Sequence, residues 1–476
     1  MGWLSDKCGA AWNFVKPVMS QVYQTVTGQL ISTLAYTGVN RLFATSPTAI
    51  AAVGLIGTVN TLLSTTSPTI GFSSVLFQES VSKEAMHPYF KAGLVISAVS
   101  AGVLTGIGWY AGDIFQILGH SAAVAQEINA YFRAFLETGG LFPSLAMLAI
   151  RGVYAKLGWF NCIMWTNIGN AALCLGASTA VYFMKPKPDN FGYALSVASW
   201  ITGITSTLHV AYAKGSRDLQ LFSRDQWWEW DRYQKLLSKG TKIMVGLIAE
   251  NLFINGLFGL LGRKGEEATA AFAVANQMAR FPIMMTVAMR RSLNFLYNQE
   301  RSDLAGRLSL LKEALAVATL TFAAPLAVWS LAAPESFIAL FSKDIANTSE
   351  ATLILRIVAV GGILDATRLV TSFIGSILEI DNQILAINLI SLGVGFGVST
   401  TVCFRGGSAS AMIASFYGGV SAAALLQGRK TYVAIVQKNS DQTLPFFGVT
   451  CQRAHSVKAT ATATETKPLL AVVENS

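Results

Sequence analysis

Residues 242–264 read Lys-Ile-Met-Val-Gly-Leu-Ile-Ala-Glu-Asn-Leu-Phe-Ile-Asn-Gly-Leu-Phe-Gly-Leu-Leu-Gly-Arg-Lys, an apolar run with basic residues at both ends. A run of this length is sufficient for a helix to cross the hydrocarbon core of a bilayer. Glu250 lies near its centre, where an acidic residue costs roughly 2.5–3.5 kcal/mol in helix insertion. We therefore predict a membrane-spanning helix in which Glu250 has a functional role.

The whole chain has the composition of an integral membrane protein. Of its 476 residues, 52% are hydrophobic and 13% are charged, with a mean hydropathy of +0.47, whereas soluble domains contain about 25% charged residues. The net charge of +9 is spread between the apolar runs, so no nucleic-acid partner is expected. The five cysteines are scattered, which predicts neither a disulfide framework nor a metal site.

Twelve apolar runs have the length of a spanning helix, which needs roughly 20 residues. The predicted fold is therefore an all-α integral membrane protein with twelve transmembrane helices. They are expected near residues 18–42, 49–77, 92–111, 126–149, 159–183, 192–213, 240–262, 268–289, 310–332, 351–377, 384–403 and 408–436.

The distribution of basic residues predicts how the chain is oriented. Loops rich in Lys and Arg stay in the cytoplasm, and such loops alternate with poorer ones along the chain. Both termini are therefore expected to be cytoplasmic, in a plasma or inner membrane. The polar segments are predicted to be a cytoplasmic N-terminal segment at 1–17, an aromatic and basic interfacial linker at 214–239, and a disordered cytoplasmic tail at 437–476.

An internal repeat divides the spanning helices into two lobes. Thr48-Ala-Ile-Ala-Ala-Val-Gly54 recurs as Thr269-Ala-Ala-Phe-Ala-Val-Ala275, at an offset of 221 residues, and other weak matches share nearly that offset. Two copies of a six-helix unit have the same orientation in the membrane. We expect lobes at 18–213 and 240–436, related by a pseudo-twofold axis along the membrane normal, with the substrate bound between them.

Several segments, in order and with specific spacing, resemble the multidrug and toxic compound extrusion (MATE) transporters. The resemblance extends from about residue 15 to residue 436. It is carried by Pro47-Thr-Ala-Ile-Ala-Ala-Val-Gly-Leu55, Arg151-Gly-Val-Tyr-Ala-Lys-Leu-Gly158, Asn167-Ile-Gly-Asn170, the stretch from Gly240 to Glu250, Ala275-Asn-Gln277 and Gly361-Gly-Ile-Leu-Asp365.

The resemblance implies an antiporter that exports amphipathic, often cationic xenobiotics in exchange for H⁺ or Na⁺, with no cofactor other than the coupling ion. In that family, a Glu of the seventh helix and an Asp of the tenth serve the cation site of the second lobe. The matching residues are Glu250 and Asp365. The expected partners are a small-molecule substrate and membrane lipid, and the chain is expected to be a monomer.

The residues themselves allow two interpretations of these acids. A carboxylate in the middle of a span needs a partner, a cation or water, and two converging carboxylates suit either a proton or a hard cation such as Na⁺. Alternatively, the acids form structural ion pairs with arginines, because Arg368 lies three residues after Asp365 on the same helix face and Arg280 lies within the eighth span.

The first lobe departs from the family pattern. Its helix-one region reads Gly38-Val-Asn40-Arg41 and its helix-five pair is Asn170 and Cys174, so the carboxylates that the family has there are missing. At the repeat offset, Glu250 corresponds to Gln29. We therefore expect any coupling ion to use the second lobe.

Other polar and flexible side chains are candidates for lining the substrate cavity. If Arg280 faces that cavity, an anionic or zwitterionic cargo is favoured, because a cation would meet a like charge. The full set of candidates is Gln29, Asn40, Asn170, Asn276, Gln277, Arg280 and Met284.

Two other functions remain open. A lipid-linked saccharide flippase has a related two-lobed design and uses a basic cavity, and an uncoupled member could act as a membrane scaffold. An enzyme is not expected, because the sequence has no nucleotide-binding glycine loop, zinc motif or nucleophile elbow.

Overall fold

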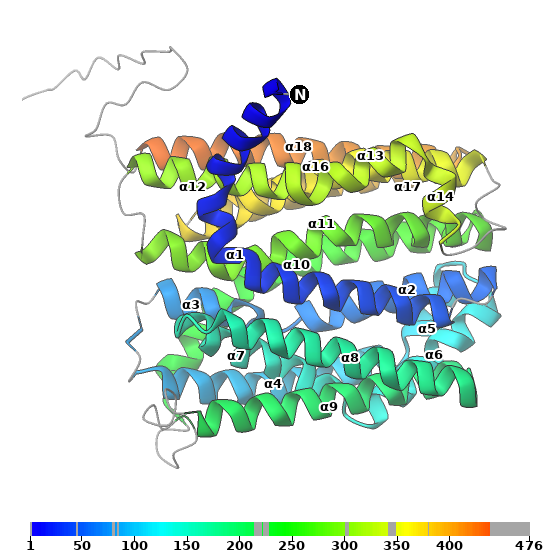
Figure 1. Cartoon of the computed structure of the whole chain (residues 1–476). Coiled ribbons are helices and arrows are strands. Elements are labelled where there is room, and N and C mark those ends of the chain that lie inside the picture. Colours follow the sequence, from blue (N-terminus) through cyan, green and yellow to red (C-terminus); the bar gives the residue numbers. More distant parts are fainter. Residues whose placement is uncertain are drawn as a thin grey trace, which may run out of the picture. The chain divides into compact units, whose positions relative to one another are not determined.

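The computed structural model describes residues 2–43, 46–78, 81–82, 85–213, 221, 228–299, 304–340, 349–378 and 380–437, and every regular element in these ranges is a helix (Figure 1). The N-terminal half comprises α1 (Gly2–Phe43), α2 (Pro47–Thr65), the 3₁₀ helix η1 (Pro68–Gly71), α3 (Phe72–Gln78), α4 (Met86–Trp109), α5 (Ala111–Leu118), α6 (Ala122–Glu137), α7 (Leu141–Lys156), α8 (Phe160–Met184) and α9 (Pro188–Tyr212).

The C-terminal half is likewise built of consecutive helices in its described residues. It comprises α10 (Trp230–Gly262), α11 (Glu266–Gln299), α12 (Leu304–Ala316), the π-helical segment η3 (Val317–Ala323), α13 (Ala324–Ala332), α14 (Pro334–Ile338), α16 (Ser349–Ile377), α17 (Asp381–Phe404) and α18 (Ala409–Gln437).

Each of the twelve predicted spans falls on one helix or on two or three consecutive helical segments. The second span is interrupted after α2, where Ser67 caps η1 and Pro68 begins it. The fourth is divided between α6 and α7 at Gly139, whose φ of 68° suits glycine. Six of the described helices are individually long and apolar enough to cross a membrane, namely α2, α4, α10, the helix over Leu308–Ala332, α17 and α18.

The seventh predicted span lies within a longer helix. α10 starts at Trp230 and continues unbroken for 33 residues, so 230–239 of the predicted linker is helical and continuous with that span. Residues 214–220 and 222–227 of the predicted linker, and all but the first residue of the predicted tail, lie outside the described residues.

Each half has its own helix packing, and a few helices join the halves. In the N-terminal half α1 packs on α8, α4 on α7 and α6 on α9, while in the C-terminal half α16 and α17 pack on α18 and α10 on α17 (Figure 1). The helix α2 packs on α10 and α11. Close approach is possible there because Gly54 leaves room for Ala273 and Phe258.

Candidate functional site

Two acidic side chains meet one arginine inside the second lobe. The Arg368 guanidinium on α16 contacts Glu250 of α10, with Nη2 2.7 Å from Oε1, and it contacts Asp365 through Nη2 and Nε, 2.6 and 2.7 Å from Oδ1. The arginine side chain is 1% exposed, that of Asp365 8% and that of Glu250 13%. We refer to Glu250, Asp365 and Arg368 as the charged triad.

The sequence of α16 explains the contact between Asp365 and Arg368 but not the contact with Glu250. Asp365 and Arg368 lie three residues apart on α16, which places both side chains on one helix face. Glu250 reaches the same guanidinium from a different helix, across 118 residues of chain. The arginine pairing that the sequence offered as an alternative to ion coupling is therefore present, and a single arginine pairs with both acids.

The charges of the triad do not cancel. Two carboxylates and one guanidinium, all ionised, leave one excess negative charge in a largely buried position. An uncompensated charge in such a place is costly, and proteins relieve it with a proton, a cation or water. The triad consequently has the charge of a binding site for one proton or one monovalent cation.

Amide side chains from two more helices extend the triad. Arg368 Nη1 donates to Asn388 Oδ1 of α17 at 3.2 Å, and Gln427 Nε2 of α18 donates to the same oxygen at 2.5 Å. The side-chain oxygen of Gln427, Oε1, is buried and has no hydrogen-bond partner in the described structure. Neither amide was predicted from the sequence, although each is a polar residue within an apolar span.

The first-lobe candidates Asn170 and Cys174 belong to a network of neutral side chains. Asn170 Oδ1 accepts a hydrogen bond from Thr202 at 3.0 Å, while its Nδ2 donates to the Tyr36 hydroxyl at 3.4 Å. The Cys174 sulfur lies 3.8 Å from the same hydroxyl. Tyr36 and Thr202 were not predicted, and the predicted residues Gln29 and Asn40 make no side-chain hydrogen bond within the described residues.

The remaining candidates form one polar surface of α11. Asn276 and Gln277 are buried, Arg280 and Met284 are partly buried, and the Arg280 guanidinium lies beside Gly57 of α2. Among the described residues, the side chains of Asn276, Gln277 and Arg280 have no hydrogen-bond or ion-pair partner. This surface is separate from the triad, whose acids contact Arg368 and not Arg280.

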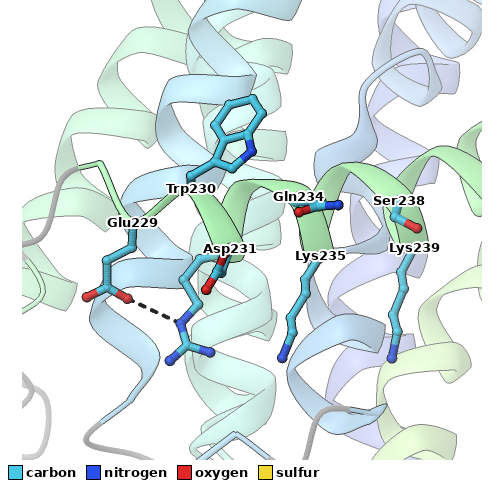
Figure 2. A pocket seen from close by; sticks show the side chains of 8 residues that line it. Glu229, Trp230, Asp231, Gln234, Lys235, Ser238 and Lys239 are labelled. Atoms are coloured by element: carbon cyan, nitrogen blue, oxygen red, sulfur yellow. Dashed lines mark hydrogen bonds and ion pairs between the residues drawn. The ribbon is translucent and has the colours of Figure 1, made fainter.

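A surface hollow at the start of α10 is a different feature. Figure 2 shows it, with an ion pair between Glu229 and Arg232. The hollow is lined by eight side chains, those of Glu229, Trp230, Asp231, Arg232, Gln234, Lys235, Ser238 and Lys239. Lys239 precedes Glu250 by eleven residues, about 16 Å along a helix, so the hollow is not the triad. The exposed Trp228 and Trp230 lie close to Tyr233, an arrangement typical of a membrane interface.

Glu266 connects the two lobes at the first turn of α11, outside the predicted span. Its carboxylate accepts hydrogen bonds from Ser121, the residue that caps α6, and from Thr48 at 2.7 Å. Beside it, His120 Nε2 lies 3.1 Å from the Phe258 carbonyl oxygen. The hydrogen bonds from Ser121 and Thr48 lower the pKa of the Glu266 carboxyl below its usual value of 4.5.

This contact predicts a pH-dependent stability difference. A lowered folded-state pKa stabilises the fold above pH 4.5, and that contribution is lost as the pH falls through the lowered value. The Glu266→Gln protein should therefore unfold at a lower temperature than wild type at pH 6, and the difference should shrink below pH 4.5. Glu267→Gln, at an exposed position, is the matched control. Equal unfolding temperatures at pH 6 would contradict the prediction.

Comparisons with known proteins support the fold. No protein-family model and no curated protein matches the chain. A MATE structure in complex with MaL6 matches with a TM-score of 0.73 and 15% identity, covering 90% of this chain and 98% of that one. The eukaryotic MATE transporter AtDTX14 matches with a TM-score of 0.74 and 12% identity, covering 90% and 99%.

A third match is a transporter of the MOP superfamily from Pyrococcus furiosus, for which reverse polarity of the binding pocket is described as suggesting a different function. Its TM-score is 0.72 and its identity 15%, covering 90% of this chain and 97% of that one. The helices and these matches define an all-α integral membrane protein of twelve spanning helices in two lobes. More particularly, the chain has the fold of the MATE transporters, as the sequence resemblance predicted.

Proposed function

We propose that this chain is a secondary active antiporter of the MATE type that exports small amphipathic organic compounds in exchange for H⁺ or Na⁺. The observation that carries the proposal is the excess negative charge of the triad, which belongs to helices that pack within the second lobe. A coupling ion needs such a site, because it must be held in one state of the protein and released in another.

The contacts support different roles for the two acids. Asp365 receives two contacts from Arg368 and is the less exposed acid, whereas Glu250 receives one contact and is 13% exposed. Asp365 therefore holds the guanidinium in place, and Glu250 exchanges the ion. Buried amide oxygens such as the free oxygen of Gln427 are also ligands that a hard cation accepts.

Alternation between two lobe arrangements then follows from electrostatics. With a proton or Na⁺ bound, the triad is neutral and stable in a dry setting. Once the ion leaves, the excess charge favours an arrangement of lobes in which water reaches Glu250. A ligand shifts the equilibrium between the two lobe arrangements only by the difference between its affinities for them. Ion release and cargo binding are therefore coupled if both favour the same arrangement.

Transport by the purified full chain in proteoliposomes tests this proposal. We expect accumulation of tetraphenylphosphonium or p-toluenesulfonate when a proton or Na⁺ gradient is imposed, and its loss when an ionophore collapses that gradient. Both probes are permanently charged, so their own ionisation does not follow the proton gradient. Equal accumulation with and without each gradient, for both probes, would exclude antiport.

One observation favours the second candidate, a lipid-linked saccharide flippase. Arg280 has no partner among the described residues and lies beside α2 of the other lobe, as a pyrophosphate-binding residue would. The flippase reading predicts that a pyrophosphate-linked lipid is translocated without any cation gradient, whereas the antiporter reading predicts gradient-driven transport of soluble compounds.

A further inference from the structure

The middle of α11 carries a group of polar side chains that the fold itself does not use. Asn276 and Gln277 are 7% and 8% exposed, and Arg280 is partly buried one turn later. In the described part of the chain none of the three has a hydrogen-bond or ion-pair partner. The nitrogen and oxygen atoms of these side chains are not among the fully buried atoms without a partner. They therefore reach accessible space, where unpaired polar groups on an otherwise buried helix can meet a ligand that is bound during function.

Helix geometry brings these groups together. Positions 276 and 280 are four apart and positions 277 and 280 are three apart, so their side chains share one side of the helix. Other sides of the same turn are already occupied, since Met278 contacts Ser330 of α13 and Ala279 lies beside Gly362 of α16. The unpartnered side is therefore distinct from the sides that pack inside the second lobe.

The guanidinium of Arg280 lies at the contact between lobes. It occupies the space where a side chain on Gly57 would project, and Gly57 belongs to α2. Ala279, the residue before Arg280, lies beside Gly362 of α16. Gly362 precedes Asp365 by less than one helical turn, so Arg280 lies near the part of α16 that carries the triad. A ligand on Arg280 would touch both lobes and lie near the ion site without sharing its groups.

The charge of this surface selects the ligand. The helix α2 carries no acidic residue, and the acids of α11 are confined to its first turn. Asp365 is paired with Arg368. An unpaired guanidinium repels organic cations and binds carboxylate, sulfonate or phosphate groups through parallel N–H donors. The neighbouring amides add further donors, and Met284, one turn further on, offers an adaptable apolar contact.

From this geometry we infer that Arg280, with Asn276 and Gln277, binds the anionic group of an amphipathic organic anion, the cargo of the transporter. The inference rests on the proposed transport function, and it assigns that function an anionic or zwitterionic substrate instead of a cationic one. Gly57 is required because any larger residue there would compete with the guanidinium for the same space.

Equilibrium binding to the full chain in lipid nanodiscs tests the inference with two probes of matched size and permanent, opposite charge. We expect p-toluenesulfonate to bind at least about tenfold more tightly than benzyltrimethylammonium, a ratio that binding assays resolve readily. Arg280→Gln should abolish this preference, and Arg280→Lys should keep part of it. Arg405→Gln, at an exposed arginine in the turn after α17, should leave it unchanged.

Gly57→Ala provides a second test that does not remove the charge. The methyl group would displace only the flexible end of Arg280, so the protein should fold normally while its affinity for the sulfonate falls. Unchanged sulfonate affinity in Arg280→Gln, or a wild-type preference for the ammonium probe, would overturn the inference. If that same wild-type protein transports the ammonium probe when a cation gradient is imposed, the antiport proposal still holds and only the anion-site inference fails. If the protein binds the sulfonate selectively but shows no gradient-driven transport, the antiport proposal fails and the anion-site inference still holds.

Discussion

Glu250→Gln should abolish transport driven by a cation gradient while leaving the protein folded. The amide preserves the shape of the side chain but removes the excess charge of the triad, because Asp365 and Arg368 then balance each other. With no charge to neutralise, the site loses its affinity for a proton or Na⁺. Accumulation of either charged probe in proteoliposomes should fall to the level measured without a gradient.

The controls come from the first lobe. Cys174→Ser and Asn40→Ala alter neutral positions, so both proteins should retain gradient-driven accumulation close to that of wild type. The Glu250→Gln protein should also unfold at the wild-type temperature or above, since a buried excess charge has been removed. Full coupled transport by Glu250→Gln would show that Glu250 is not the coupling residue.

Arg368→Met should cause the largest loss of stability of any substitution in the site. Removing the guanidinium leaves two largely buried carboxylates close together without their partner. Breaking a buried ion pair from one side costs about 3–5 kcal/mol, because the remaining charge is uncompensated. Thermal unfolding followed by tryptophan fluorescence should therefore show a marked decrease in the midpoint at neutral pH.

Neutral replacements of the acids should reverse this effect. When Arg368→Met is combined with Glu250→Gln and Asp365→Asn, no buried charge is left, and the unfolding midpoint should return close to the wild-type value. The matched control is Arg356→Met, at an exposed arginine of the same helix, which should alter the stability by at most about 0.5 kcal/mol. An Arg368→Met protein as stable as the control would mean that the triad contributes no structural ion pairing.

The helices could be predicted because the signal for each one lies in its own stretch of sequence. A helix satisfies all its backbone hydrogen bonds internally, so the apolar runs predicted the spans without knowledge of their neighbours. The boundaries that differ have local causes. The interruption at Pro68 follows from capping by Ser67, and α10 begins at Trp230 because polar residues can extend a helix beyond the membrane.

The site could be predicted only in part, because its partners come from separate helices. Glu250 and Asp365 were recognisable as costly acids in apolar runs, and Arg368 as a neighbour of Asp365 on one helix. Asn388 and Gln427 are single polar residues in apolar spans, and hydropathy alone does not predict that they contact each other or Arg368. Similarly, Tyr36 was not predicted as the contact of Asn170 and Cys174, since helix rotation decides which side chains face each other.

The sequence by itself determined the twelve spans, the two six-helix halves and the confinement of central acids to the second lobe, since hydropathy, repetition and charge are properties of the chain alone. Only the tertiary structure decided that one arginine holds both acids, that four helices supply the site and that Arg280 lies unpaired beside Gly57. These facts depend on which faces of separate helices meet, and side-chain packing between helices settles that.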